Sequence, residues 1–332
     1  AEVVLTNVED GLAYQHLNLG APTGVAPDGR VIYWQNAATG NGSARANQDP
    51  RFNDVLLTKQ TGKGHGENLS VSLTKPNNGG DWFWQMAYSY SDATEASPLT
   101  SSRAISNWRN QTSFNSNEIV SARSNYVVRD RITAAVSWSH AFFGDYKTSV
   151  GLFYEGRTGS PYSWAFNNDA NGDGRSNDLL FIPGSPDDVV FRDIAGGMTA
   201  AQQAKLFWST VAANSDLQGS RGHAVDRNGS FMPWRNTFDL RLSQELPGFF
   251  NGNKTMVWLD VFNIGNLIDK DWGQSEEVLF DDGNGGFARN FVTYKGIENG
   301  KYVYEVTKGP EAFTDRDLPS RWSVQVGVSY KF

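Results

Sequence analysis

Residues 321–332 carry the feature that most constrains the fold of this chain. Between Arg321 and Phe332, apolar or aromatic residues occupy every second position, and the positions between them are polar or glycine. Successive side chains of an extended strand point to opposite faces of a sheet, so this alternation gathers the apolar side chains on one face. They are Trp322, Val324, Val326, Val328, Tyr330 and Phe332. The pattern predicts a β-strand that ends on an aromatic residue.

The same alternation recurs along the chain and predicts further strands. They are expected at 2–7, 69–74, 82–91, 132–140, 150–154, 238–243 and 257–261. Tight turns are expected at 76–80, 144–145 and 247–253, where Gly, Asn, Asp or Pro occur. Long connections rich in Gly, Asn, Asp and Ser are expected at 20–50, 92–122, 158–232 and 269–320.

Short and long connections that alternate indicate an up-and-down antiparallel meander, with tight turns on one side and large loops on the other. Outer-membrane β-barrels have this asymmetry, and their walls alternate lipid-facing with lumen-facing side chains. The sequence therefore predicts an all-β fold, an antiparallel up-and-down transmembrane β-barrel with long extracellular loops. Counting from the short turns leaves Phe332 on the short-turn side.

Composition agrees with this fold class and excludes several others. The 332 residues include no Cys, which rules out disulfides and thiolate metal sites. A net charge of -7 and a mean hydropathy of -0.48 argue against general nucleic-acid binding and against a helical membrane protein. Aromatic residues make up 13% of the chain, which suits a membrane barrel and also a secreted carbohydrate-binding β protein.

The number of strands indicates part of a larger assembly. About ten segments have the length of barrel strands, and residues 2–7 already have the character of a mid-strand segment. We therefore expect residues 1–332 to be the C-terminal segment of a larger barrel, with no plug domain in this chain. Any signal peptide is expected to lie outside it.

Several motifs, in order, resemble the C-terminal barrel of TonB-dependent outer-membrane receptors of the Oar-like group. The resemblance covers about residues 120–332 and is looser before that. The motifs are Ser160-Pro-Tyr162 with Asp169-Ala-Asn-Gly-Asp-Gly174 and Asn177-Asp178; Met198-Thr-Ala-Ala-Gln-Gln203 with Arg221-Gly222 and Arg227-Asn228; Pro233-Trp-Arg235 with Phe238-Asp-Leu-Arg-Leu242; Leu259-Asp-Val-Phe-Asn263 with Asn266-Leu267 and Asp271-Trp-Gly273; and Ser320-Arg-Trp322 through Phe332.

The resemblance implies a function and a set of partners. The family imports large ligands through a 22-stranded barrel, plugged by an N-terminal domain and energised by a TonB-type complex of the inner membrane. This chain would supply barrel wall and extracellular loops in the bacterial outer membrane. Its implied partners are outer-membrane lipid, the remainder of the barrel with its plug, the TonB-type complex through other parts of the receptor, and a transported ligand of unknown identity.

One loop has the spacing of a calcium site. Asp169, Asn171 and Asp173 place oxygen ligands at alternate positions, Gly174 stands sixth, and Arg175 follows to offer its carbonyl. The twelfth position, usually Glu, is Leu180, so Asp178 would have to replace it. Calcium is therefore a candidate cofactor. The alternative is an Asp/Asn/Gly-rich turn without an ion.

The polar positions of the strands have a functional interpretation, as a polar wall that meets ligand or plug, and a structural one, which is favoured. Asp239, Arg241, Asp260 and Asn263 lie opposite the apolar positions, and cross-strand ion pairs that solvate a lumen are expected there. The aromatic residues Trp82, Trp84, Trp138, Trp258 and Trp322 are expected to form an interfacial girdle. His140, at the end of an apolar stripe, is expected near the same interface.

The long loops contain local structure of their own. Thr199-Ala-Ala-Gln202 is a capping box that predicts a helix to about Ala213, with Leu206, Phe207 and Val211 on one face. A weaker signal predicts a helix at 100–110. Hairpin turns are expected at Asp281–Gly286 and Glu298–Gly300.

Enzymatic activity is not expected. There is no G-x-S-x-G elbow, no phosphate loop, and no His pair at i, i+4 spacing that would hold zinc. Two non-enzymatic alternatives stand beside import. One is a structural or adhesive outer-membrane barrel. The other is a soluble, secreted β protein that binds calcium or carbohydrate, in which the apolar stripes would face a second sheet.

Overall fold

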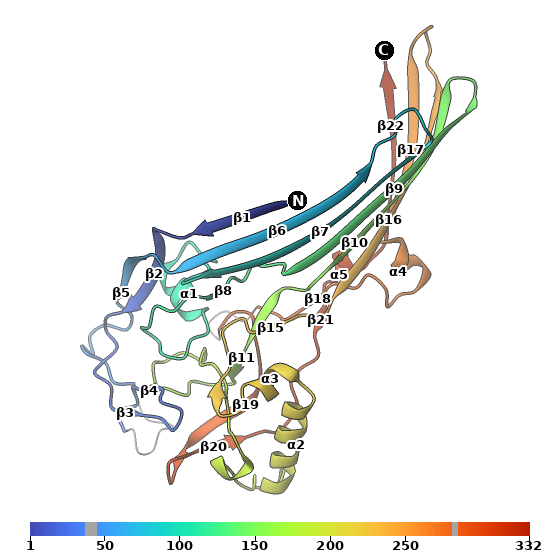
Figure 1. Cartoon of the computed structure of the whole chain (residues 1–332). Coiled ribbons are helices and arrows are strands. Elements are labelled where there is room, and N and C mark those ends of the chain that lie inside the picture. The colour runs from blue at the N-terminus through green and yellow to red at the C-terminus, as the bar shows by residue number, and fades with distance from the viewer. Residues whose placement is uncertain (37–44, 281–284) are drawn as a thin grey trace.

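The chain is built around one long antiparallel sheet (Figure 1). A computed structural model describes residues 1–36, 45–280 and 285–332. Strand order follows chain order among the eight strands along the sheet, and a short ninth strand, β8 (Ala122–Arg123), pairs with β7. The eight are β1 (Glu2–Asn7), β6 (Gly64–Lys75), β7 (Trp82–Glu95), β9 (Asp130–Phe143), β10 (Tyr146–Arg157), β16 (Arg235–Pro247), β17 (Lys254–Phe262) and β22 (Ser323–Lys331).

The register of these strands gives the sheet one apolar face. One cross-strand row contains only apolar side chains over six strands, and the next row on the other face is largely polar. The apolar row is Trp84, Val136, Leu152, Leu240, Val261 and Val324. The row on the other face is Phe83, Ser137, Gly151, Arg241, Asp260 and Gln325. A shift of one residue would exchange the two faces, so the pattern fixes the register.

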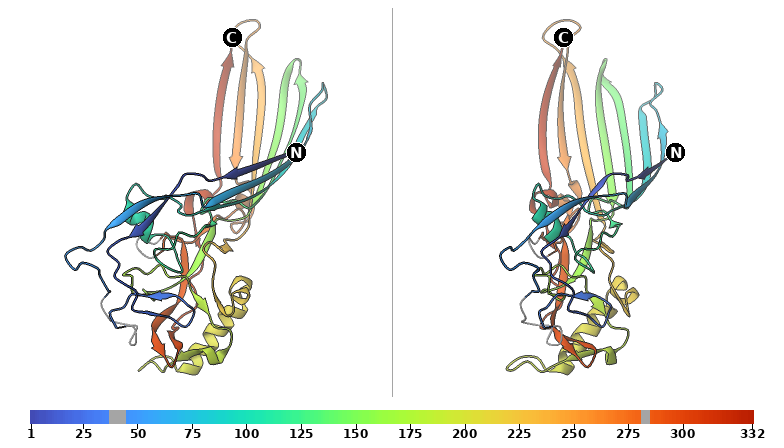
Figure 2. Two further views of the ribbon diagram at one scale, coloured as in Figure 1. Left: turned by 60° about the vertical axis from the view of Figure 1, so that its left-hand side comes forward. Right: turned by 90° about the vertical axis from the view of Figure 1, so that its left-hand side faces the viewer.

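The tight turns and the long loops lie at opposite ends of the sheet (Figure 2). Short turns join β6 to β7, β9 to β10 and β16 to β17, as predicted. The C-terminus lies at this end, because the Tyr330 hydroxyl accepts hydrogen bonds from Phe249 N at 3.1 Å and Asn253 Nδ2 at 2.9 Å in the β16–β17 turn. The prediction for Phe332 is confirmed.

At the other end, the long loops pack into a body with its own core. A five-stranded sheet of order β13-β20-β19-β11-β15 lies within it. The bounds are β11 (Pro161–Phe166), β13 (Val189–Phe191), β15 (Ser230–Phe231), β19 (Ala288–Glu298) and β20 (Lys301–Glu305). All six residues of β11 are buried. Aromatic side chains dominate the core, among them Trp164, Phe166, Phe207, Phe291 and Tyr304.

Helix α2 (Ala200–Ala212) covers this core, and its sequence signals are confirmed. Thr199 and Gln202 form the reciprocal capping box, and Phe207 and Val211 are buried while Leu206 packs at the edge of the core. Gln203 is also buried: its amide donates to the carbonyl of Arg192, and its oxygen accepts from Val306 N. Among the described residues, no helix combines the length and apolarity needed to cross a membrane.

Short elements complete the loop body. The strands are β2 (Gly11–His16), β3 (Gly24–Val25), β4 (Val31–Ile32), β5 (Leu56–Thr61), β12 (Phe181–Ile182), β14 (His223–Ala224), β18 (Glu276–Glu277) and β21 (Thr314–Asp315). The helical turns are α1 (Ala104–Arg109), η1 (Pro186–Asp188), α3 (Ser215–Gly219), α4 (Ile264–Ile268) and α5 (Asp317–Ser320).

Four expectations from the sequence are wrong, and a fifth concerns a turn that lies partly outside the described residues. The main sheet has eight strands along its open length, fewer than the ten or so expected, and β11, β19 and β20 lie within the long connections and form the separate loop sheet. That loop sheet contains two parallel pairs, β11 with β19 and β13 with β20. Helix α1 begins four residues later than the expected helix. The expected 298–300 hairpin joins β19 to β20, whereas part of the 281–286 turn lies outside the described residues.

The fourth correction concerns the aromatic girdle. Trp82 and Trp138 are register partners on the apolar face, and Trp138 stacks on His140 with ring centroids 5.9 Å apart. Trp258 lies on the polar face, where Arg241 stands 5.9 Å from its ring. Successive side chains of a strand point to opposite faces. Because Leu259 and Val261 lie on the apolar face, Trp258 lies on the polar face.

Candidate functional site

The loop at 169–178 is a compact turn held by the carboxylate of Asp169. One oxygen of this carboxylate accepts hydrogen bonds from Asn171 N at 3.2 Å and Gly172 N at 2.6 Å, and the other accepts from Gly174 N at 2.7 Å. Gly172 and Gly174 have φ values of +82° and +88°, which side chains with a Cβ disfavour. The expectation that the sixth position needs glycine for a sharp turn is confirmed.

Asn171 and Asp173 continue the same pattern of side chain bonded to backbone. The amide oxygen of Asn171 accepts from Asp173 N, and Asp173 Oδ1 accepts from Arg175 N, both at 2.8 Å. Ser116, from a different loop, donates its hydroxyl to Asp173 and accepts from Asn171 Nδ2 at 3.1 Å. Both Asn171 and Asp173 are fully buried.

Asp178 joins this turn to a buried arginine. Its Oδ2 accepts from Ala170 N at 2.8 Å, and its Oδ1 lies 2.9 Å from Arg30 Nη1. Arg30 is fully buried between the rings of Phe114 and Phe166, and it also donates to the carbonyl of Leu179. Arg30 thus competes with any cation for Asp178.

Burial and mutual repulsion disfavour the charges of the three aspartates. Burial raises the pKa of Asp178 to about 7, and the charge of Asp173 adds to this effect against the opposing pull of Arg30. Burial also raises the pKa of Asp169 and that of Asp173. For Arg30, burial alone would lower the pKa, but Asp178, Tyr302 and Asp28 together outweigh burial and the net shift is upward. The turn therefore has more buried negative charge than Arg30 balances.

The donor atoms fit calcium in chemistry, and the structure brings them together only in part. Calcium takes six to eight oxygen ligands, including carboxylates, amide oxygens and backbone carbonyls. Asp169, Asn171 and Asp173 offer such oxygens within one turn. In residues 1–36, 45–280 and 285–332, however, no three His, Cys, Asp or Glu side chains converge on a common metal position.

Arg175 has a second set of contacts that ties the turn to β2. Its Nη2 lies 2.8 Å from Asp54 Oδ2, and Asp54 Oδ1 lies 2.8 Å from His16 Nε2. His16 is buried with its ring 5.0 Å from that of Trp108. Burial lowers the pKa of His16 despite its bond to Asp54. We therefore take His16 as neutral.

The polar face of the main sheet carries the expected ion pair. Arg241 binds both oxygens of Asp260 at 2.6 Å, a bidentate cross-strand contact. Asp239 accepts from Asn263 N at 2.8 Å where β17 ends. Asp239, Arg241 and Asp260 lie on the face predicted for them, whereas Asn263 follows the end of β17 and belongs to no strand. The four residues contact one another in two pairs.

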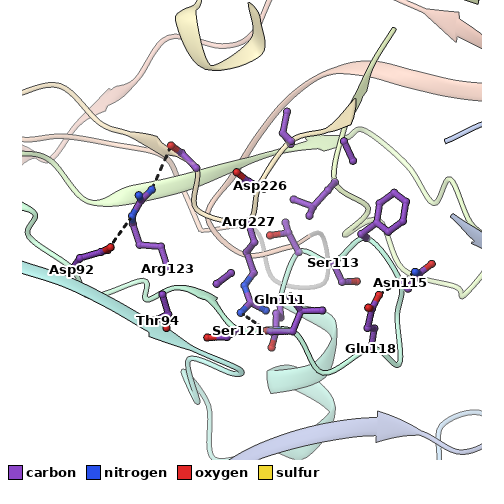
Figure 3. Close-up of a pocket in the computed structure, with 18 residues that line it drawn as sticks. Asp92, Thr94, Gln111, Ser113, Asn115, Glu118, Ser121, Arg123, Asp226 and Arg227 are labelled. Atoms are coloured by element: carbon purple, nitrogen blue, oxygen red, sulfur yellow. Dashed lines mark hydrogen bonds and ion pairs between the residues drawn. The ribbon is translucent and has the colours of Figure 1, made fainter. Parts of the chain in front are cut away.

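A pocket of about 490 Å³ lies where β7 and β8 meet the loop body (Figure 3). The guanidinium of Arg227 lies at its wall and donates to the backbone carbonyls of Glu95, Ala96 and Val120. Burial lowers the pKa of Arg227 to about 10. Arg123 lies 3.7 Å from Asp92 at the same pocket. Because Arg227 bridges segments more than 100 residues apart, it holds the loop body to the sheet.

Sequence reasoning located the turn but missed the groups that surround it. Arg30, Ser116, Asp54 and Trp34 come from segments more than 50 residues away in the sequence, and no local spacing identifies them. The adjacent carboxylates of Asp187 and Asp188 lie in η1, where Asp188 accepts from the hydroxyl of Ser185 at 2.8 Å. The Asp281-Asp282 pair lies outside the described residues.

Comparison with known proteins adds no family. No family model matches the chain, and neither the curated proteins nor the solved structures contain a match.

The turn predicts a difference between two glycines. Both Gly172 and Gly300 have positive φ, but a Cβ on Gly172 would lie 2.5 Å from Trp34 N, whereas a Cβ on Gly300 would contact nothing within 4 Å. We expect G300A to cost about 1–2 kcal/mol of backbone strain and G172A to cost clearly more. Hydrogen exchange of the 169–178 amides checks this. Equal exchange rates in the two variants would contradict the packing of Trp34 on the turn.

The buried imidazole predicts a dependence of local stability on pH. The pKa of His16 in the folded chain lies below the usual value of 6.5 for histidine, so folding favours the neutral ring. Its contribution to stability is complete above pH 6.5 and is lost as the pH falls through 6.5 towards the folded pKa. NMR titration, with the imidazole signal assigned by its loss in H16Q, should give a midpoint below 6.5. A midpoint above that value would refute the burial argument.

Proposed function

We propose that the chain is the C-terminal part of the barrel of a TonB-dependent outer-membrane receptor, and that it supplies barrel wall and extracellular loops to the import of a large ligand. The lipid of the outer membrane would cover the apolar face of the main sheet. The remaining strands and the plug of the barrel would complete the wall and fill the lumen, and a TonB-type complex would energise transport through those other parts.

The observation that carries the proposal is the uncovered apolar face. Val326 and Val328 of β22 are 68% and 65% exposed, and Leu73 of β6 is 63% exposed. Val326 and Leu73 belong to cross-strand rows of apolar side chains on one face of the sheet, and Val328 pairs with Val257 on the same face. Burying such a face in water would require a second layer, whereas acyl chains would cover it without one.

The other face and the two ends of the sheet support the same proposal. The Arg241–Asp260 pair gives the inner wall the polarity expected of a water-facing lumen. The open sheet leaves the outer edges of β1 and β22 without strand partners among the described residues, and neighbouring strands of a closed barrel would pair with them. All the long loops project from one end, as extracellular loops do.

The two alternatives make different demands. An adhesive or structural barrel would have the same wall, and evidence of a plug and an energy-coupling motif in the complete receptor would distinguish import from adhesion. A soluble calcium or carbohydrate binder needs its apolar stripes covered by a second sheet. Within the described residues the loop sheet packs beyond one end of the main sheet, and the exposed valines of β22 stay uncovered.

A structural calcium ion is a separate proposal for the 169–178 turn. Asp169, Asn171 and Asp173 would hold it with their side-chain oxygens, and Arg175 would offer its carbonyl. Asp178 would join only if it loosened its contact with Arg30. The ion would balance the excess buried negative charge of the turn and stabilise the loop body.

The membrane proposal predicts opposite outcomes at adjacent positions of β22. V326R places a cation on the lipid face, at a cost of about 2–4 kcal/mol near the bilayer midplane. Q325R places it on the polar face opposite Asp260. We expect V326R to lower the fraction of receptor that assembles as a protease-resistant barrel in the outer membrane, and Q325R to leave it close to that of the parent. Equal assembly of the two variants would count against the orientation.

The calcium proposal predicts that chelation loosens the turn. Removing calcium with EGTA should speed proteolysis within residues 167–180, measured by mass spectrometry of the fragments, and adding calcium should restore protection. D169N should abolish the response, whereas D187N, in the exposed η1 turn, should retain it. If the parent chain is cleaved at the same rate with and without calcium, the calcium proposal is wrong.

A further inference from the structure

Three arginines stand side by side at the loop end of the main sheet. Arg157 of β10 is the register partner of Arg131 on β9, and on its other side it is the partner of Arg235 on β16. All three lie on the polar face. Like charges directly opposite one another on neighbouring strands destabilise a sheet. The row therefore lowers stability unless negative charge compensates it.

Carboxylates of the chain compensate only part of this row. Glu155 lies closest to Arg131, with a 2.6 Å contact to its guanidinium, and it is 3.9 Å from Arg157 Nε, too far for a hydrogen bond. Arg235 donates Nη2 to the carbonyl of Pro319 at 2.8 Å. Its Nε is buried without a hydrogen-bond partner, and among the residues that the structure describes no carboxylate lies within ion-pair distance of it.

Two of these arginines, Arg157 and Arg235, line a pocket of about 430 Å³ whose lining also includes Glu276 and Glu277 of β18. Arg157, Arg235 and Arg316 line it on one side, with Arg316 Nε 3.1 Å from Glu277. Tyr126, Pro161 and Met232 give it an apolar wall. The volume falls within the range of small-molecule sites, which combine an apolar lining with a few polar groups.

We propose that this pocket binds an organic monocarboxylate with an apolar substituent. The carboxylate takes the place between Arg157 and Arg235, where planar guanidinium groups donate paired hydrogen bonds. The apolar substituent packs on Met232 and Pro161. Glu276 and Glu277 on the same lining repel a second negative charge, so the pocket selects a single carboxylate over a phosphate. This inference goes beyond the import proposal, because the site binds its ligand whether or not the chain takes part in transport.

The test uses the complete protein that contains residues 1–332, purified in detergent micelles, with N-acetyl-L-leucine as the acidic probe and N-acetyl-L-leucinamide as the matched neutral probe. Calorimetric titration should show the acid binding at least tenfold more tightly than the amide. R157Q and R235Q should each weaken binding of the acid about tenfold or more, with little change for the amide. R192Q, at an exposed arginine paired with Glu298 in the loop body, should behave as the parent.

A second measurement separates binding from a merely structural role. Without probe, R157Q should melt at the parent temperature or above it, because the substitution relieves repulsion within the row. Equal affinity for acid and amide would overturn the proposal, and so would inorganic phosphate that competes as strongly as the acid. If R235Q does not fold, R157Q decides, and undiminished binding of the acid to R157Q overturns the site. This binding measurement is independent of the assembly of V326R in the outer membrane, which tests the import proposal separately.

Discussion

The hydrogen-bonded register of the antiparallel ladder is the constraint on which the rest of the structure depends. Each strand alternates apolar with polar side chains, but the alternation makes a surface only because the strands pair in phase. The row from Trp84 to Val324 stays apolar across six strands, and the neighbouring row on the opposite face holds Arg241 and Asp260. A slip of one residue would place the ion pair on the apolar face, so register and facial polarity stabilise each other.

The loop body solves a different physical problem. Its segments connect the strands of the main sheet. These segments are too long to remain ordered without a core of their own. Aromatic side chains supply that core, with Phe207 of α2 packed on Phe291 and Tyr304. Buried polar contacts then fix how the loops meet, as when Arg30 reaches Asp178 across 148 residues of sequence. Such contacts leave little freedom in how the loops are placed relative to one another.

Charge is distributed unevenly, and the two places of imbalance are the places where ligands are proposed. At the 169–178 turn, buried carboxylates outnumber the arginine that contacts them. At the Arg131–Arg157–Arg235 row, guanidinium groups outnumber the acids within reach. The strands and the turn would be more stable with these charges balanced. Local instability of this kind is a general mark of sites that bind charged ligands, and the first imbalance favours a cation while the second favours an anion.

The sequence by itself determined the strands, the tight turns, the capping box of α2 and the Asp/Asn turn with its glycines, because each depends on residues a few positions apart. It also determined which face each strand residue occupies, and the alternation places Trp258 on the polar face with Asp260, away from the other tryptophans of the main sheet. Tertiary contacts alone bring β11, β19 and β20 of the long connections into a sheet of their own, join Arg30 to Asp178, and place three arginines in one row. Those contacts join segments that lie tens to hundreds of residues apart, and no local period encodes which distant segments will meet.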